Sequence, residues 1–219
     1  GRPVLREEDL RLLQGRGRYL DDVAALDLAH AVVFRSPVAH ADILSLVVEA
    51  ARAAPGVLAV LTGDDLAKRG LGNIGVMTPC KKFDGSDGFV RIRPLLAQGR
   101  VRYVGEAVAF VVAETLNQAK DAAELIEFEF NTLPVLATLD DALANDAPAL
   151  WEENPDNQAY TFKRGDAEAT EAAIADAAHV VRHRVCVNRV AGNAMENRGC
   201  IGHYDEFEDR YNLRATVQS

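Results

Sequence analysis

The sequence has few cysteines and no long apolar run. Only three of its 219 residues are cysteine, and no two stand in a C-x-x-C spacing. The spacing therefore indicates neither a disulfide framework nor a zinc or iron–sulfur site, and it favours a reducing, cytoplasmic compartment. No apolar stretch approaches the ~20 residues that a membrane-spanning helix needs, so we expect no membrane span.

Positive charge is also scarce. The chain carries 24 Lys and Arg against 33 Asp and Glu, a formal charge of -9. An acidic chain without a basic stripe is a poor candidate for binding nucleic acid or an anionic membrane. The hydrophobic fraction of 48% is ordinary for a globular protein, and a chain of this length can bury a core without disulfides or metals.

Hydrophobic periodicity predicts an α+β fold. Apolar and β-branched runs predict strands over residues 28–35, 43–48, 57–62, 101–104, 107–113 and 127–130. Helical spacing predicts helices over residues 7–14, 49–54, 65–69, 116–126 and 139–143. The predicted N-caps of the last three helices are Asp64, Thr115 and Thr138.

The composition changes towards the end of the chain. Residues 145–158 are rich in Asn, Asp, Pro and Glu, which predicts a linker and a domain boundary. A helix capped by Asp166 and strands are expected beyond it, the strands over residues 180–188, 199–205 and 211–219. The chain begins without Met and stops inside the last strand pattern, so we interpret it as a truncated fragment.

The segment Gly70–Gly75 (GLGNIG) matches G-x-G-x-x-G letter for letter. A dinucleotide site needs this loop between a strand and a helix, so that the helix N-terminus can hold the pyrophosphate. Here a helical segment precedes the glycines, and Thr78-Pro79 interrupts the chain just after them. We therefore favour a flexible glycine loop, and a free-standing nucleotide-binding enzyme is the third hypothesis for the chain.

Two histidines, His179 and His183, could be combined with Glu196 and His203 into a metal site. The valines around them predict a strand instead. On a strand, positions 179 and 183 lie roughly 13 Å apart, too far for one metal ion. We expect structural histidines and no metal ligand, and no catalytic triad or carboxylate pair can be recognised.

A series of phrases stands in order along the chain: GRGRYLDD at 15–22, FRSPVAHA at 34–41, APGV at 54–57, RPLLA at 93–97, VRYVGEAVA at 101–109, VAET at 112–115, AKDAAE at 119–124, GD at 165–166 and NAMENRG at 193–199. Together they resemble the large subunit of the xanthine dehydrogenase, aldehyde oxidase and aerobic carbon monoxide dehydrogenase family of molybdenum hydroxylases. The resemblance implies a lead-in over 1–14, an α/β-hammerhead domain over 15–145, a linker over 146–165 and the truncated start of a molybdopterin-binding domain over 166–219.

The resemblance also implies the chemistry of the full subunit. A molybdopterin cofactor, often the cytosine dinucleotide form, holds molybdenum, and [2Fe–2S] clusters and FAD reside on small and medium partner subunits in a dimer of heterotrimers. The reaction is hydroxylation with water-derived oxygen, or CO oxidation at a Mo–Cu centre. The resemblance leaves the small-molecule substrate open between CO, an aldehyde, a purine and another N-heterocycle.

One residue of the family's site falls within this chain. Gln218, in Thr216-Val217-Gln218-Ser219, matches a Ser/Thr-x-Gln pattern whose glutamine approaches an oxo ligand of the metal; an ordinary polar strand residue is the alternative. The catalytic glutamate and the cofactor loops are expected beyond Ser219, so no catalytic residue is assigned here and the isolated chain is expected to be inactive. Glu196 is expected to be structural.

Part of the sequence departs from the family. The loop over 75–91 matches none of its phrases, and Cys80 within it is not the copper-binding cysteine. The role of this loop and the oligomeric state of the chain are left open. A non-catalytic module that docks partner subunits is the alternative hypothesis for the whole chain.

Overall fold

A computed structural model describes residues 1–219 except 24–26, 72, 76–79, 92, 188–189 and 218–219. The chain divides into two compact units. The central unit comprises residues 29–177, and the terminal unit combines residues 1–28 with residues 178–219. The domain boundaries predicted from the sequence at residues 15, 146 and 166 stay predictions.

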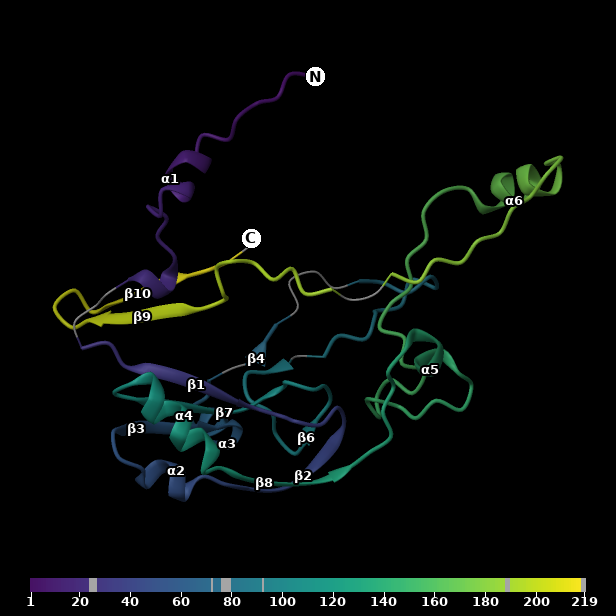
Figure 1. Ribbon diagram of the computed structural model, residues 1–219. Coiled ribbons are helices and arrows are strands. Elements are labelled where there is room, and N and C mark those ends of the chain that lie inside the picture. Colours follow the sequence, from purple (N-terminus) through teal and green to yellow (C-terminus); the bar gives the residue numbers. More distant parts are fainter. Residues whose placement is uncertain (24–26, 72, 76–79, 92, 188–189, 218–219) are drawn as a thin grey trace. The chain divides into compact units, whose positions relative to one another are not determined.

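The central unit contains two three-stranded antiparallel sheets (Figure 1). The first has the order β1 (His30–Arg35), β7 (Ala107–Ala113), β3 (Val57–Thr62). The second has the order β6 (Arg100–Val101), β2 (Ala41–Val47), β8 (Glu127–Thr132). Strand β7 is apolar at every position and is the middle strand, so it contributes Val108, Ala109, Val111 and Ala113 to the core.

Helix α4 (Leu116–Glu124) contacts β1 and β7 with the face predicted from its alanines. Ala119, Ala122 and Ala123 are all buried there, together with Ile126 beyond the helix end. Small side chains on this face let the helix approach the sheet closely. The predicted cap is confirmed, because the Thr115 hydroxyl accepts a hydrogen bond from the Gln118 amide at 3.3 Å.

Two local predictions in the central unit are wrong. Helix α3 (Gly63–Lys68) is capped by Thr62 rather than by Asp64. The Thr62 hydroxyl accepts from the Asp65 amide at 3.3 Å, and the Asp65 carboxylate accepts from the Thr62 amide at 2.9 Å, which is a capping box. The strand predicted over 101–104 ends at Val101, because the chain turns at Gly105, whose φ is +85°.

The remaining elements of the central unit are short. They are α2 (Glu49–Ala53), β4 (Asn73–Ile74), β5 (Arg93–Pro94), α5 (Leu139–Leu143) and α6 (Ala167–Ala175). The predicted caps of α5 and α6 are confirmed: Thr138 accepts from the Asp141 amide, and Asp166 accepts from the Ala169 amide. None of the helices in the described part of the chain is long and apolar enough to cross a bilayer.

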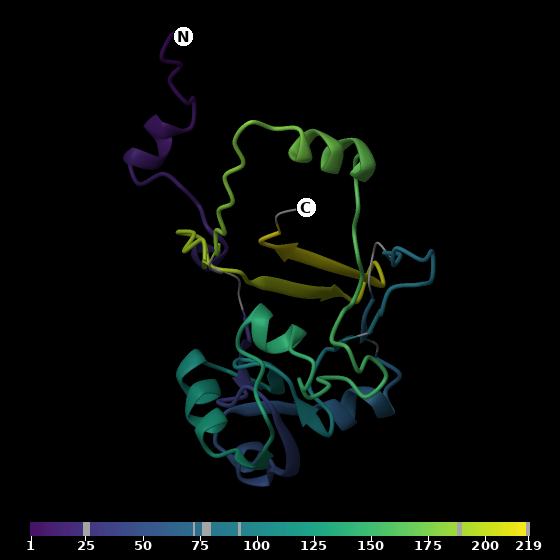
Figure 2. The ribbon, with the colours of Figure 1, turned by 90° about the vertical axis from the view of Figure 1, so that its right-hand side faces the viewer.

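The terminal unit is built around a hairpin of β9 (Cys200–Asp205) and β10 (Arg210–Ala215), whose two antiparallel arrows are visible in Figure 2. It also contains α1 (Asp9–Leu13) and a 3-10 turn, η1 (Leu20–Asp22). None of its described residues is buried. The unit therefore has no core of its own among the described residues.

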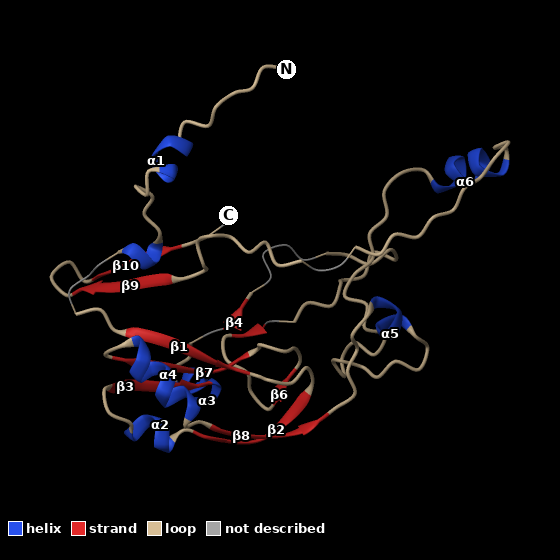
Figure 3. Cartoon of the chain, in the orientation of Figure 1, coloured by secondary structure: helices blue, strands red, loops and turns tan. Residues whose placement is uncertain are grey.

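The strand predicted over 180–188 is wrong for the described residues 180–187, which are loop (Figure 3). A strand pattern forms a strand only where another backbone pairs with it, and no described residue pairs with this segment. His179 and His183 therefore do not share a strand. Both side chains are exposed.

Candidate functional site

The predicted cofactor-contacting residue, Gln218, lies outside the described residues. The structure does describe the hairpin that leads to it. Strands β9 and β10 pair in continuous register from Arg210↔Asp205 to Ala215↔Cys200. The backbone of β10 is therefore extended and paired as far as Ala215, the residue before Thr216.

Hydrogen bonds of Thr216 join the end of this hairpin to residues 197–199. The Gly199 amide donates to the Thr216 hydroxyl at 2.8 Å, and the Thr216 amide donates to the Gly199 carbonyl at 3.0 Å. The Thr216 hydroxyl donates in turn to the Asn197 carbonyl at 3.1 Å. The backbone two residues before Gln218 is thus held by three hydrogen bonds.

Glu196 anchors the other side of the same segment. Its carboxylate accepts a hydrogen bond from the Leu20 amide at 2.9 Å, at the start of η1. The Leu20 side chain also packs against Gly199, where an added Cβ would lie 2.9 Å from Leu20 Cδ2. The described partner of Glu196 is therefore a backbone amide, as expected for a structural role. This contact joins the GRGRYLDD and NAMENRG phrases within the terminal unit.

The glycine segment Gly70–Gly75 does not have the arrangement of a dinucleotide loop in its described residues. Helix α3 precedes it, and Asn73–Ile74 form β4, which pairs with Arg93–Pro94 of β5. Gly72 lies outside the described residues. Within the described part of the chain, no group of three or more His, Cys, Asp or Glu side chains is placed to hold a metal ion.

The predicted linker is part of the central unit and packs against the rest of it through Trp151, the chain's one tryptophan. The Arg102 guanidinium carbon lies 3.4 Å from the centre of the Trp151 ring, and that of Arg91 lies 4.9 Å from it. Arg91 also pairs with Glu153 at 3.0 Å. Burial, together with the neighbouring Arg100, lowers the pKa of Arg102 below its ordinary value.

The loop over 80–89 has a defined shape and lies against residues 159–161. The Phe89 amide donates to the Ala159 carbonyl at 2.6 Å, and the Phe83 amide donates to the Thr161 hydroxyl at 2.8 Å. An added Cβ at Gly88 would lie 2.8 Å from the Ala159 carbonyl oxygen and 2.6 Å from that of Cys80. The close approach of the two segments therefore requires glycine at this position.

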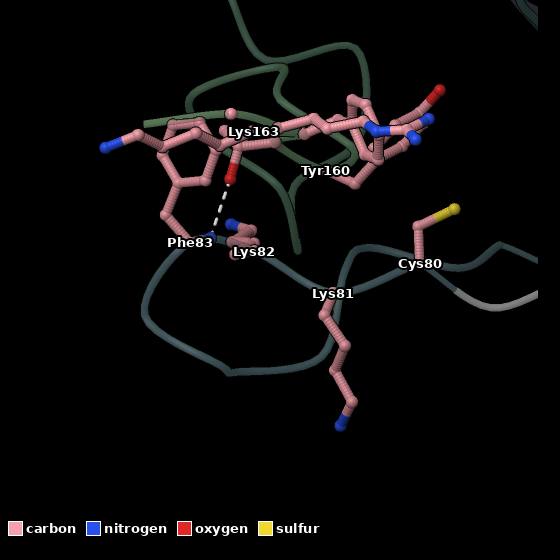
Figure 4. A pocket seen from close by; sticks show the side chains of 10 residues that line it. Cys80, Lys81, Lys82, Phe83, Tyr160 and Lys163 are labelled. Carbon is pink, nitrogen blue, oxygen red and sulfur yellow. Dashed lines mark hydrogen bonds between the residues drawn. The ribbon is translucent and has the colours of Figure 1, made fainter. Parts of the chain in front are cut away.

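An open pocket of about 710 Å³ lies between these two segments and is shown in Figure 4. We call it the basic pocket. It is lined by Cys80, Lys81, Lys82, Phe83, Tyr160, Thr161, Phe162, Lys163, Arg164 and Gly165. The pocket is not predicted from the sequence. The available signal was two pairs of adjacent basic residues, Lys81-Lys82 and Lys163-Arg164, in an otherwise acidic chain.

Two family models match the chain in succession. The model described as aldehyde oxidase and xanthine dehydrogenase, a/b hammerhead domain, matches residues 14–134. A molybdopterin cofactor-binding domain matches residues 150–219. The chain belongs to the molybdenum hydroxylase large-subunit family. The predicted fold class is thereby confirmed: an α+β chain with the hammerhead domain followed by the start of the molybdopterin-binding domain.

Relatives within the molybdenum hydroxylase family match over the whole chain. The nicotine 6-hydroxylase large subunit of Paenarthrobacter nicotinovorans is 37% identical over 100% of this chain and 26% of its own length. The carbon monoxide dehydrogenase large chain of Afipia carboxidovorans is 32% identical over 98% of this chain and 27% of its own. The chain thus spans about a quarter of the length of the curated relatives it matches.

A solved oxidoreductase has the same fold over this region. The crystal structure of quinoline 2-oxidoreductase from Pseudomonas putida 86 superposes with a TM-score of 0.76 at 35% identity, covering 98% of this chain and 26% of that one. The resemblance inferred from the short sequence phrases is therefore confirmed at the level of the family.

Proposed function

We propose that this chain is the N-terminal part of the molybdenum-containing large subunit of an oxidoreductase, and that the full subunit hydroxylates a small molecule with oxygen derived from water. The observation that carries the proposal is the succession of a hammerhead match and a molybdopterin-domain match along one chain. Because the curated relatives are about four times as long, the activity belongs to the whole subunit and the isolated chain is inactive.

Gln218 is the residue of this chain that we propose to contact the cofactor. The molybdenum cofactor, when bound, supplies the oxygen-atom and electron transfer, and this chain's own share is to hold one side-chain amide beside it. A glutamine amide offers both a donor and an acceptor, so it fits an oxygen ligand of a metal. The contacts of Thr216 with Gly199 and Asn197 support the proposal, because they fix the backbone two residues earlier.

The cofactor and the partner subunits follow from the same proposal. We infer a molybdopterin cofactor in its cytosine dinucleotide form, with [2Fe–2S] clusters and FAD on small and medium subunits in a dimer of heterotrimers. The relatives support separate subunits, because their names designate a large subunit and a large chain.

We favour an N-heteroaromatic compound as the substrate, with a molybdenum centre that lacks copper. Nicotine 6-hydroxylase and quinoline 2-oxidoreductase are 37% and 35% identical to this chain, against 32% for the carbon monoxide dehydrogenase large chain. Assays of the assembled enzyme with nicotine, quinoline, an aldehyde and CO test this choice. Turnover of CO without turnover of either heterocycle would overturn it.

The test of the proposed function compares Gln218→Ala with the native protein in the whole subunit, assembled with its partners. We expect the molybdenum content to stay stoichiometric and kcat to fall on the order of 10²-fold, because misplacing one contact to a reacting centre costs about this much. Unchanged turnover of Gln218→Ala would mean that Gln218 has no part in the reaction. A native whole subunit that binds no molybdenum and turns over none of the substrates would favour the alternative, a non-catalytic docking module. For the 219-residue chain alone we expect neither bound molybdenum nor turnover, and stoichiometric molybdenum with turnover would contradict its proposed inactivity.

A further inference from the structure

Another pocket, of about 420 Å³, lies within the central unit. Its lining includes the guanidinium groups of Arg91 and Arg102, the ring of Trp151 and the amide side chains of Asn73 and Gln98. We call it the arginine pocket. It belongs to the unit that contains the buried core, and it shares no residue with the hairpin that leads to Gln218.

Arg102 is held in one orientation at the wall of this pocket. Its Nε donates to the Leu150 carbonyl at 3.3 Å, and its guanidinium carbon lies 3.4 Å from the centre of the Trp151 ring. The side chain is partly buried. In the described part of the chain, no carboxylate forms an ion pair with this guanidinium. Since removing a cation from water is costly unless an anion compensates it, Arg102 is suited to an external anion.

Arg91 brings a second guanidinium to the same ring. Its guanidinium carbon lies 4.9 Å from the centre of the Trp151 ring. Its Nη1 pairs with Glu153 at 3.0 Å, and the two side chains are 48% and 56% exposed. An ion pair this exposed contributes little stability, because water and salt screen it. Another anion can therefore replace Glu153 beside Arg91.

The charges around Arg102 favour an anion. The nearby Glu106 carboxylate accepts from the backbone amide of Arg102, at 2.6 Å, rather than from its guanidinium. Burial and Arg100, with Arg91, lower the pKa of Arg102. The carboxylates of Glu106 and Glu153 oppose this shift without cancelling it. The arginines therefore outweigh the carboxylates at the position of this guanidinium.

We propose that the arginine pocket binds a small-molecule oxyanion, a carboxylate or a phosphate, whose oxygens accept from the guanidinium groups of Arg102 and Arg91. A guanidinium presents its N–H groups as a planar fork that matches two oxygens of such an anion. The Trp151 ring already orients Arg102, so little side-chain entropy is lost on binding. The volume is in the range of ligand pockets, which leaves room for an organic anion. The site does not rest on the proposed function of the whole subunit.

Calorimetric titration with inorganic phosphate tests the site in the whole subunit, assembled with its partners. We expect saturable binding with a Kd on the order of 1 mM. Arg102→Lys keeps the charge but removes the fork and should weaken binding about ten-fold, and Arg91→Gln should weaken it about five-fold. The matched control Lys120→Gln loses one positive charge at an exposed position on α4 and should bind as the native protein does. Titration with acetate in place of phosphate shows which of the two anions the fork prefers.

A change of opposite sign separates this site from phosphate bound elsewhere. Glu153→Gln removes the carboxylate that pairs with Arg91 and should tighten phosphate binding about three-fold or more. Glu152→Gln is the matched control, because Glu152 is exposed and lies one residue away without pairing with either arginine. It should change the Kd less than Glu153→Gln does.

Three outcomes would overturn the proposal. One is a native subunit that binds neither phosphate nor acetate, which includes the case in which a carboxylate from the rest of the subunit fills the pocket. Another is phosphate binding that is equal in the native protein, Arg102→Lys and Arg91→Gln, which would place the anion elsewhere. The third is a Glu153→Gln variant that binds phosphate no more tightly than Glu152→Gln does. If Arg102→Lys failed to assemble, Arg91→Gln and Glu153→Gln would still decide, since both replace exposed side chains.

Discussion

The guanidinium carbon of Arg102 lies 3.4 Å from the centre of the Trp151 ring, and Arg102 Nε donates to the Leu150 carbonyl at 3.3 Å. The two residues come from the VRYVGEAVA phrase and from the predicted linker. A cation over an aromatic face contributes about 0.5–2 kcal/mol, more when it is shielded from water. Arg102 therefore holds residues 150–151 against the rest of the central unit.

Replacing Arg102 by alanine should release this contact. We expect Arg102→Ala to lower the free energy of unfolding by about 1–2 kcal/mol and to shift the Trp151 emission to longer wavelength as the ring meets water. Urea unfolding followed by tryptophan fluorescence measures both effects, because the chain has one tryptophan. Arg91→Ala is the matched control, since Arg91 lies 4.9 Å from the ring and 48% of its side chain is exposed. Equal effects of the two variants would contradict the assigned role of Arg102.

The same contact explains why part of the structure could not be predicted from the sequence. The caps at Thr115, Thr138 and Asp166 were predictable, because each depends on a hydrogen bond to a residue three positions away. The packing of Trp151 and the basic pocket join segments separated by about 50–80 residues, and composition says nothing about which segments meet. The polarity of residues 145–158 therefore predicts a linker but not the packing of Trp151 within them.

Two of the three wrong assignments, the cap of α3 and the strand over 180–188, have different physical causes. At α3, Thr62 and Asp64 are both good cap formers, and the choice is made by Asp65, whose side chain completes a capping box with Thr62. Over 180–187 the valines favour an extended strand, but a strand also needs a neighbouring backbone to pair with, and none is described. The family resemblance was carried by short phrases and did not depend on either assignment.

The capping box of α3 should make stability depend on pH. The backbone amide of Thr62, then its hydroxyl and the charge of Arg52, lower the pKa of Asp65 below its ordinary value of 3.8. A lowered pKa in the folded state means that the stabilisation is complete above the unfolded value and is lost as the pH falls through the folded one. We expect Asp65→Asn to cost about 1 kcal/mol at pH 7, as the loss of a cap does.

The measurement is thermal or urea unfolding of both proteins from pH 7 down to pH 2.5. The difference between native protein and Asp65→Asn should shrink once the pH falls below the ordinary pKa of Asp65. Asp64→Asn is the matched control, because Asp64 lies beside the box without completing it, and it should have a smaller effect at neutral pH. A difference that stays constant down to pH 2.5 would show that the carboxylate charge is not involved.

His40 should tolerate one polar replacement better than a small apolar one. Its side chain is 6% exposed, and Nδ1 lies 2.7 Å from the Pro134 carbonyl oxygen, while Nε2 is buried without a partner in the described structure. Asparagine places an amide near the position of Nδ1 and removes the unpartnered nitrogen. We expect His40→Ala to cost about 2–3 kcal/mol, through a lost buried hydrogen bond and a cavity, and His40→Asn to cost about 1 kcal/mol or less. Equal losses in urea unfolding would mean that the bond to Pro134 contributes little.

The contacts of Thr216 predict how the proposed role of Gln218 depends on its neighbours. Thr216→Val keeps the shape of the side chain but removes the hydroxyl that accepts from the Gly199 amide and donates to the Asn197 carbonyl. In the whole subunit we expect this change to displace residue 218 and to lower kcat about ten-fold, since small displacements near a reacting centre are costly. Thr216→Ser keeps the hydroxyl and should retain most of the turnover. Metal analysis of both variants separates a positioning effect from loss of the cofactor, because the molybdenum content should stay equal. If Thr216→Val turned over at the native rate, the hydrogen bonds of Thr216 would have no part in placing Gln218.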